Sequence, residues 1–191
     1  MIEKTLVLIK PDGVQRGLIG EIILRFEKCG LKIIGIKMVY ASRELAGKHY
    51  TDDEAWLKSV GEKSIKSYEN QGKKLTVDPL TQGKQVREWL LDYITASPIV
   101  ALILEGHNAV RNVRKIVGPT SPADAAPGTI RGDFTFDTPM LGDMQKRPVQ
   151  NLIHASGSVE EAQTEIKIWF KPEEIHAWKR IDEDLLYREG N

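Results

Sequence analysis

Hydrophobic residues occur in four short, nearly continuous runs, and between the runs they recur at every third or fourth position. Apolar runs of this length, bounded by turn-forming residues, are typical of buried strands. The spacing of three to four in the intervening segments predicts amphipathic helices that pack on a sheet. The four predicted strands are Thr5–Lys10, Leu31–Ala41, Ile99–Glu105 and Asn151–His154.

Five helices are predicted from this spacing, and most of them begin or end at a residue that suits a helix terminus. Ser42 and Asn108 precede two of them, and Ser158 with Glu161 forms a capping-box pattern at the start of a third. Gly30 follows the first helix as a C-terminal cap. The predicted helices are Leu18–Phe26, Leu45–Tyr50, Val86–Ile94, Ala109–Val117 and Val159–Trp169.

The order of these elements predicts an α+β fold, a ferredoxin-like βαββαβ sandwich in which helices cover one face of an antiparallel four-stranded sheet. Two stretches interrupt that order, at about 52–85 and 135–148, and neither has a long apolar period. We therefore expect both to be surface insertions. At 191 residues with 41% hydrophobic content, the chain 1–191 fits a single domain better than two.

Charge and cysteine content narrow the class of protein. Lys+Arg and Asp+Glu number 27 each, which argues against general binding of nucleic acid or a membrane surface but leaves room for a local basic pocket. The single cysteine, Cys29, cannot form an internal disulfide, and we expect it to be a small buried hydrophobe beside Phe26. No segment approaches the roughly 20 apolar residues of a membrane span, so a soluble, cytoplasmic protein is expected.

One histidine lies where it could do chemistry. His154 is in the short turn between the last predicted strand and a well-capped helix. A neutral imidazole, with an ordinary pKa of roughly 6.5, can accept a phosphoryl group and pass it on. Glu165, at the margin of that helix's apolar stripe, could orient the ring; the alternative is an ordinary surface glutamate. The other histidines, His49, His107 and His176, are expected on helix surfaces or at strand ends.

A phosphate site is suggested by the Gly- and Pro-rich loop at 118–134, which holds Thr120 and Arg131. Backbone N–H groups, a hydroxyl and a guanidinium suit phosphate oxygens, although an ordinary surface loop has the same composition. Arg114 lies at the edge of a buried helical stripe. Lys10 ends a buried strand, where it could reach a crevice or simply extend to solvent. The usual sequence motifs for nucleotide binding and for zinc binding are absent, so any phosphate chemistry needs a different arrangement of phosphate-binding groups.

Several blocks of the chain resemble the signature sequences of the nucleoside diphosphate kinase family. The blocks are Ile9–Gly17, Pro122–Asp124, Gly128–Phe134 and Asn151–Ser156, followed by Ser158 and Glu165. The resemblance covers about 3–51, 86–134 and 149–189, nearly all of the chain outside the two insertions. It implies reversible, ping-pong transfer of the γ-phosphoryl group from a nucleoside triphosphate such as ATP to a nucleoside diphosphate such as GDP, through a phosphohistidine at His154, which maintains nucleoside triphosphate pools.

The resemblance also implies a role for particular residues. Glu165 and Ser156 match the pair that supports the histidine, and Tyr50 lies beside the active centre. The residues that match the nucleotide-binding set are Lys10, Arg114, Thr120, Arg131 and Asn151. Mg²⁺ would arrive bound to the nucleotide phosphates, in agreement with the lack of an all-protein metal cage. Family members assemble as homohexamers or tetramers, and neither nucleic acid nor a membrane is an expected partner.

One expected aromatic residue is missing. The family has a phenylalanine that stacks on the nucleobase, and the alignment puts Val86 at its position. Trp89, or Trp56 or Tyr68 in the first insertion, could replace it. The second insertion could cover the site or extend a contact between subunits.

Two other readings belong to different classes of protein. A non-catalytic nucleotide-binding or scaffolding member of the same fold would usually lack His154, Arg114 or Arg131, and all three are present. An RNA-binding module of the same topology needs exposed aromatic residues on its central strands. Thr5–Lys10 and Ile99–Glu105 contain none, which disfavours that reading.

Overall fold

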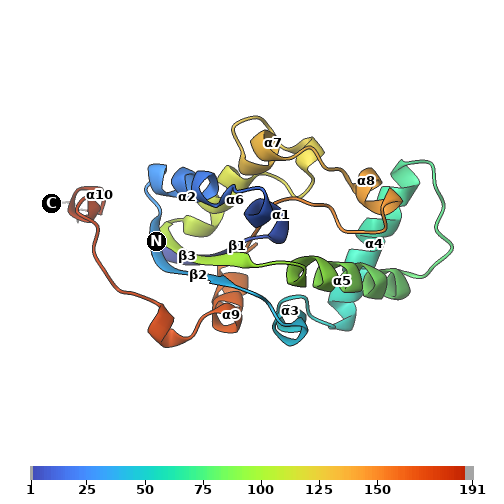
Figure 1. Ribbon diagram of the computed structural model, residues 1–191, viewed down its shortest axis with the longest axis horizontal. Coiled ribbons are helices and arrows are strands. Elements are labelled where there is room, and N and C mark those ends of the chain that lie inside the picture. The colour runs from blue at the N-terminus through green and yellow to red at the C-terminus, as the bar shows by residue number, and fades with distance from the viewer. Residues whose placement is uncertain (1, 188–191) are drawn as a thin grey trace.

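The computed structural model describes residues 2–187, and its centre is a four-stranded antiparallel sheet (Figure 1). The strands are β1 (Ile2–Ile9), β2 (Lys32–Val39), β3 (Ile99–His107) and β4 (Ile153–Ala155). Their order across the sheet is β2-β3-β1-β4, and all three neighbouring pairs are antiparallel. The predicted α+β, ferredoxin-like sheet is thereby confirmed, and the last strand is shifted towards the C-terminus by one to two residues.

Helices connect and cover the strands. Those in the first half of the chain are α1 (Pro11–Gln15), α2 (Ile19–Lys28), α3 (Arg43–His49), α4 (Glu54–Asn70) and α5 (Pro79–Thr95). Those that follow are α6 (Ala109–Val117), α7 (Ile130–Phe134), α8 (Pro139–Met144), α9 (Val159–Trp169) and α10 (Glu183–Leu186). None of the described helices is long and apolar enough to cross a membrane.

The predicted helix caps are largely confirmed. The hydroxyl of Ser42 accepts from the N–H of Leu45, and that of Ser158 accepts from the N–H of Glu161. Gly30 has the positive φ of a C-terminal cap, +83°. Two details differ. Asn108 precedes α6 in a left-handed conformation, and its side chain does not cap the helix. The capping box at α9 is not closed, because the carboxylate of Glu161 accepts from the N–H of Gly157 and not from that of Ser158.

Helices cover both faces of the sheet, so the expectation of a single covered face is wrong. The reason is the alternation of side chains along a strand that is apolar throughout. In β1, Leu6 and Leu8 pack with α3, α5 and α9, whereas Val7 and Ile9 pack with α2 and α6. Figure 1 shows the two layers, with α2 and α6 on one side of the sheet and α3 and α9 on the other.

The first insertion is a long helix and not an irregular surface segment. Helix α4 packs against α5, which itself begins at Pro79, inside the expected insertion. The two backbones approach closely because glycines meet at the crossing: a Cβ on Gly61 would lie 1.8 Å from the carbonyl oxygen of Pro79, and one on Gly83 would lie 1.9 Å from that of Leu57. A contact face built partly from glycine carries no apolar stripe, which hid this helix in the sequence.

The second insertion contains the short helix α8 and is fastened at both ends. Asp143 accepts a hydrogen bond from Gln71 at the end of α4, with a donor–acceptor distance of 3.0 Å. Asp137 accepts from Arg147 at 2.6 Å and from the backbone N–H of Gln150 at 2.6 Å. The segment therefore connects α4 to the strand that carries His154.

Cys29 is exposed, so the prediction of a buried thiol is wrong. Ile22 and Phe26 point inward from α2, and Cys29 follows the helix at its C-cap, off that inward face. Past α9 the chain runs along the edge strand β2, where the indole N–H of Trp178 donates to the carbonyl of Ile33 at 3.0 Å.

The glycine contact between α4 and α5 gives a first prediction. Gly83→Ala should lower the free energy of unfolding by about 1–3 kcal/mol, because the added methyl group overlaps the backbone of α4. Gly20→Ala in α2 is the matched control, since nothing lies within 4 Å of its Cβ position. Urea unfolding of both variants measures the difference, and equal stability of the two would contradict the rigid docking of α4.

Candidate active site

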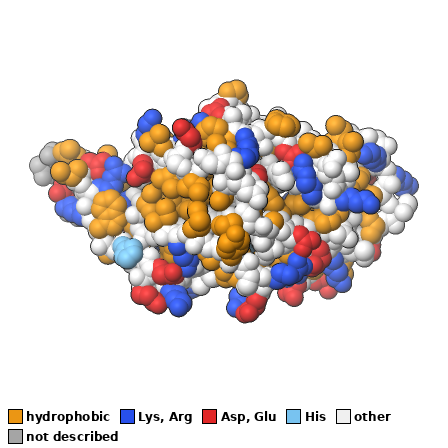
Figure 2. All heavy atoms as spheres, viewed as in Figure 1, with side chains coloured by type: hydrophobic (Ala, Val, Ile, Leu, Met, Phe, Trp, Pro, Cys, Tyr) orange, Lys and Arg blue, Asp and Glu red, His pale blue; other side chains and the backbone are white. Residues whose placement is uncertain are grey.

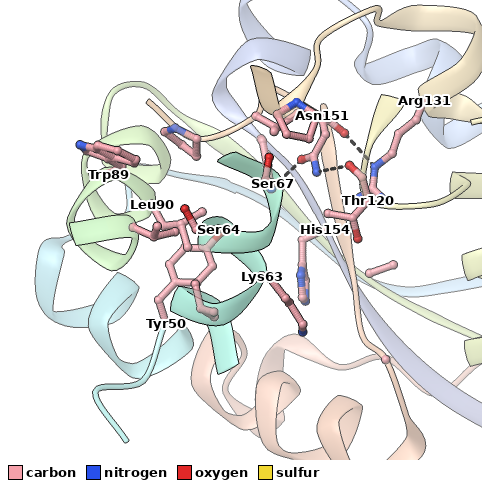
Figure 3. A pocket seen from close by; sticks show the side chains of 18 of the residues that line it. Tyr50, Lys63, Ser64, Ser67, Trp89, Leu90, Thr120, Arg131, Asn151 and His154 are labelled. Atoms are coloured by element: carbon pink, nitrogen blue, oxygen red, sulfur yellow. Dashed lines mark hydrogen bonds between the residues drawn. The ribbon is translucent and has the colours of Figure 1, made fainter. Parts of the chain in front are cut away.

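The site lies around a cavity of about 500 Å³ that opens beside β4. Its walls come from segments far apart in the sequence: the end of β1, helices α4, α5 and α6, the loop at 118–134, the second insertion and β4 itself. Both insertions thus take part in it. Figure 3 shows His154, Asn151, Thr120 and Arg131 on one side of this space and Trp89 and Leu90 of α5 on the other.

The ring of His154 is held by one of its two nitrogens. Residue 154 pairs with Leu8 of β1, and its Nε2 lies 2.8 Å from Oε1 and 2.9 Å from Oε2 of Glu165. Glu165 also accepts a hydrogen bond of 2.6 Å from the hydroxyl of Ser156. Because the carboxylate accepts the proton on Nε2, the lone pair of Nδ1 is left free.

Burial keeps this ring neutral. Desolvation, together with the nearby ammonium of Lys10, lowers the pKa of His154 to about 3. Burial also raises the pKa of Glu165, while His49 and Ser156 act in the opposite direction. Near pH 7 the imidazole is therefore uncharged and nucleophilic.

His49 belongs to the site, so the prediction that it lies on a helix surface is wrong. Its ring centroid is 4.5 Å from that of His154, and its Nδ1 is 3.5 Å from Oε1 of Glu165. The indole N–H of Trp169 donates to the same Nδ1 at 3.3 Å. The sequence contained a signal: His49 lies three residues after the buried Ala46 and therefore on the inward face of α3.

His49, His154 and Glu165 lie close enough together for a metal ion, with their possible ligand atoms within 4.8 Å of one another. Hydrogen bonds already engage these atoms, as described above. Burial lowers the pKa of His49 to about 3, so this ring too is neutral. The cluster is a hydrogen-bonded network that fixes the reactive ring.

A second network joins the cationic residues of the cavity. The ammonium of Lys10 donates to the side-chain oxygen of Asn151 at 2.8 Å, and the amide nitrogen of Asn151 donates to the carbonyl of Thr120 at 2.9 Å. The buried guanidinium of Arg131 donates to three backbone carbonyls, those of Gly118, Asn151 and Ile153. Figure 3 shows Arg131, Asn151 and Thr120 together on one side of the cavity. Arg131 thus holds the 118–134 loop against β4.

Asp12 and Tyr93 complete this network and were missed from the sequence. The hydroxyl of Tyr93 donates to Asp12 at 2.5 Å, and the backbone N–H of Leu152 donates to the other carboxylate oxygen at 3.1 Å. Burial raises the pKa of Tyr93. Leu152 has a positive φ of +65°, a strained conformation that clusters at functional sites. Only contacts across the fold bring these residues together, and no local pattern signals them.

The remaining predicted residues also line the cavity. Arg114 and Thr120 are exposed there, Tyr50 is buried, and burial raises the pKa of its hydroxyl. Val86 lines the wall where the stacking aromatic was expected. Trp89 lines it too, whereas Trp56 packs on the core and Tyr68 lies near Asp143.

A neutral histidine with one free ring nitrogen, facing a cavity rich in Lys and Arg, is the arrangement expected of a phosphotransferase. Comparison with known proteins shows which family of phosphotransferases the chain belongs to. A family model described as nucleoside diphosphate kinase matches residues 3–57 and 57–175. The chain therefore belongs to the nucleoside diphosphate kinase family.

Individual relatives agree with this assignment. The nucleoside diphosphate kinase of Pyrobaculum aerophilum is 50% identical over 179 residues, which are 91% of this chain and 98% of the relative. A crystal structure of an NDP kinase from the same organism superposes with a TM-score of 0.90 at 47% identity, covering 93% of this chain and all of the other. A structure of the Borrelia burgdorferi nucleoside-diphosphate kinase, a transition state mimic with bound vanadate and ADP, superposes with a TM-score of 0.79 at 36% identity and covers 96% of each chain.

The protein is thus an enzyme that transfers phosphoryl groups between nucleotides, and the predicted family and activity are confirmed. Members of this family bind nucleotides and generally need a divalent metal.

The buried Lys10 gives a prediction about pH. Desolvation, reinforced by Arg131 and opposed by Asp12, lowers the pKa of Lys10 to about 7 in the free protein. Bound phosphates favour the ammonium form, so above pH 7 nucleotide binding takes up a proton. The affinity should therefore fall as the pH rises from 7 to 9, by at most about tenfold per pH unit.

Calorimetric titration with a nucleoside diphosphate at several pH values tests this expectation. Lys10→Gln should bind more weakly and lose most of the dependence between pH 7 and 9. A flat profile for the unmodified protein would show that Lys10 does not change protonation on binding.

Proposed function

We propose that the phosphoryl group passes through Nδ1 of His154. The observation that carries this is the carboxylate of Glu165 on Nε2, which leaves Nδ1 as the free nucleophile. The Nδ1 lone pair attacks the γ-phosphorus of the triphosphate. The bond from that phosphorus to the bridging oxygen breaks, its electron pair stays on the departing diphosphate, and a second diphosphate takes the group in the reverse step.

The other residues act by position and charge. Arg114, Thr120 and Lys10 are proposed to hold the phosphates, while Arg131 and Asn151 keep these groups in place through the hydrogen bonds described above. Ser156 supports Glu165. Phosphoryl transfer depends mainly on alignment of the reacting groups and on neutralisation of the phosphate charge. Lys10, Arg114 and Arg131 supply the positive charge. Tyr50 and Val86 are proposed to border the nucleotide.

The divalent metal is proposed to be Mg²⁺, held by the nucleotide phosphates. Within the described residues, the carboxylates that line the cavity are Asp143 and Glu161, and both accept hydrogen bonds from the protein. A protein cage of carboxylates is therefore not available at the phosphate end. The metal would neutralise phosphate charge during transfer.

The remaining proposals concern the chain as a whole. We propose that 1–191 is one nucleoside diphosphate kinase domain with insertions at about 52–85 and 135–148, that it acts in the cytoplasm, and that nucleic acid is not required. On the face shown in Figure 2, positive and negative side chains are interspersed, which disfavours a nucleic-acid surface.

We propose a homohexamer, with a tetramer as the alternative. Apolar side chains on the edge strand β2 and just after it support self-association: Ile36 is 51% exposed, Met38 59% and Tyr40 71%. Light scattering coupled to size exclusion should give six chains per particle. Met38→Lys should shift the distribution to smaller species, and a monomeric parent protein would contradict the proposal.

Phosphorylation with γ-labelled ATP and Mg²⁺, followed by a chase with GDP, tests the mechanism. We expect an acid-labile, base-stable label that moves to GDP and is absent from His154→Ala. Glu165→Gln should slow labelling by about 100-fold or more, because the amide no longer selects the reactive tautomer. His176→Ala, which changes an exposed histidine outside the cavity, is the matched control and should label normally.

The same experiment distinguishes an active kinase from a non-catalytic, nucleotide-binding scaffold of the same fold. Nucleotide binding with no label in the parent protein would favour a non-catalytic member of the family. A label that persists in His154→Ala would instead place the phosphoryl group on another residue.

A further inference from the structure

The cationic side chains that line the cavity differ in how far the protein already engages them. They are Lys10, Lys63, Arg114, Arg131 and Arg147. Lys10, Arg131 and Arg147 already donate hydrogen bonds to oxygen atoms of the protein. Within residues 2–187, no hydrogen bond or ion pair engages the side chain of Lys63 or of Arg114. These two cations are therefore the ones available to an anionic ligand.

Lys63 belongs to the first insertion, whereas Arg114 belongs to α6 of the central fold. Lys63 lies on α4, where it lines the same cavity as His154. Figure 3 shows the side chain of Lys63 directed from α4 toward His154, at the end of the cavity where the phosphoryl group is transferred in the proposed mechanism. The insertion thus brings a positive charge to the phosphate end of the site.

The backbone at Lys63 is held firmly, although the end of its side chain is free. Gly61, two residues earlier, is so close to α5 that a Cβ there would lie 1.8 Å from the carbonyl oxygen of Pro79. The next residue, Ser64, accepts a hydrogen bond of 2.9 Å from Gln82 of α5. The flexible four-carbon stem of a lysine lets its ammonium follow a ligand from this fixed starting point.

The charge balance of the cavity also favours an anion. Within the described residues, the carboxylates that line it are those of Asp143 and Glu161, and they face a larger number of cationic side chains. Both carboxylates accept hydrogen bonds from other groups of the protein, and neither forms an ion pair with Lys63. Phosphate oxygens suit a free ammonium, because charge-assisted hydrogen bonds are the stronger ones.

We propose that Lys63 binds the terminal phosphate of a nucleoside triphosphate, as a further cation beside Lys10, Arg114 and Arg131. Its ammonium neutralises the non-bridging oxygens of the phosphoryl group, and no bond is made or broken at Lys63 itself. A nucleoside diphosphate lacks this group, so Lys63 favours the triphosphate. The proposal rests on the proposed function for the position of the phosphoryl group, and it gives the first insertion a part in substrate binding.

Equilibrium titration with the Mg²⁺ complexes of ADP and of a β,γ-methylene analogue of ATP tests the proposal. No phosphoryl group is transferred to the protein, so the result is separable from the labelling experiment that tests the phosphohistidine. In Lys63→Gln the affinity for the analogue should fall about tenfold and that for ADP about twofold or less. Lys66→Gln, on the same helix but outside the cavity, is the matched control and should leave both affinities unchanged.

The ratio of the two affinities is the readout, because a general distortion of the cavity weakens both nucleotides and cancels in it. Lys63→Arg keeps the positive charge and should keep the ratio of the unmodified protein. An unchanged ratio in Lys63→Gln would overturn the proposal, and so would a Lys63→Arg variant that loses as much affinity for the analogue as Lys63→Gln does.

Discussion

The hydrogen bond between Glu165 and Nε2 of His154 is the interaction on which the rest of this site depends. A free imidazole in water exchanges its proton between two nitrogens, and only one tautomer has its lone pair directed at a given substrate. The carboxylate removes that choice. Burying a carboxylate is costly unless it is satisfied, and here Ser156 and the two histidine rings surround it. The packing of α9 against β1 therefore serves both stability and nucleophile orientation.

At the proposed phosphate-binding residues, backbone carbonyls hold a cationic side chain in position. The guanidinium of Arg131 donates three hydrogen bonds to carbonyls of the 118–134 loop, of β4 and of the residues just before β4. Burial lowers the pKa of Arg131 to about 10. The guanidinium therefore remains charged near pH 7, and it adds positive electrostatic potential to the site besides holding the backbone in place. Arg114 and Thr120 stay exposed and available to a ligand. One arginine thus shapes the site while the other is free to bind.

The sequence was sufficient for the sheet, for the capped helices and for the principal residues of the site. The strands are nearly continuous in apolar residues, and Ser42 and Ser158 mark helix starts, so local patterns sufficed there. They failed where the fold uses long-range contacts. Gly61 and Gly83 give α4 and α5 a contact face with no apolar stripe, and Asp12 meets Tyr93 only after the chain has folded. His49 was readable from its spacing to Ala46, but a histidine is seldom assigned to a core.

The strand that carries His154 is only three residues long, yet it is anchored from several independent directions. Arg131 binds the carbonyls of Asn151 and Ile153, Asp12 binds the N–H of Leu152, and Lys10 binds the Asn151 side chain. None of these contacts comes from the segment immediately before the strand. That segment can change in length at little cost, because each doubling of a flexible loop costs only about 0.6 kcal/mol. The chain can therefore acquire new material, such as α8, directly upstream of its reactive residue without moving it.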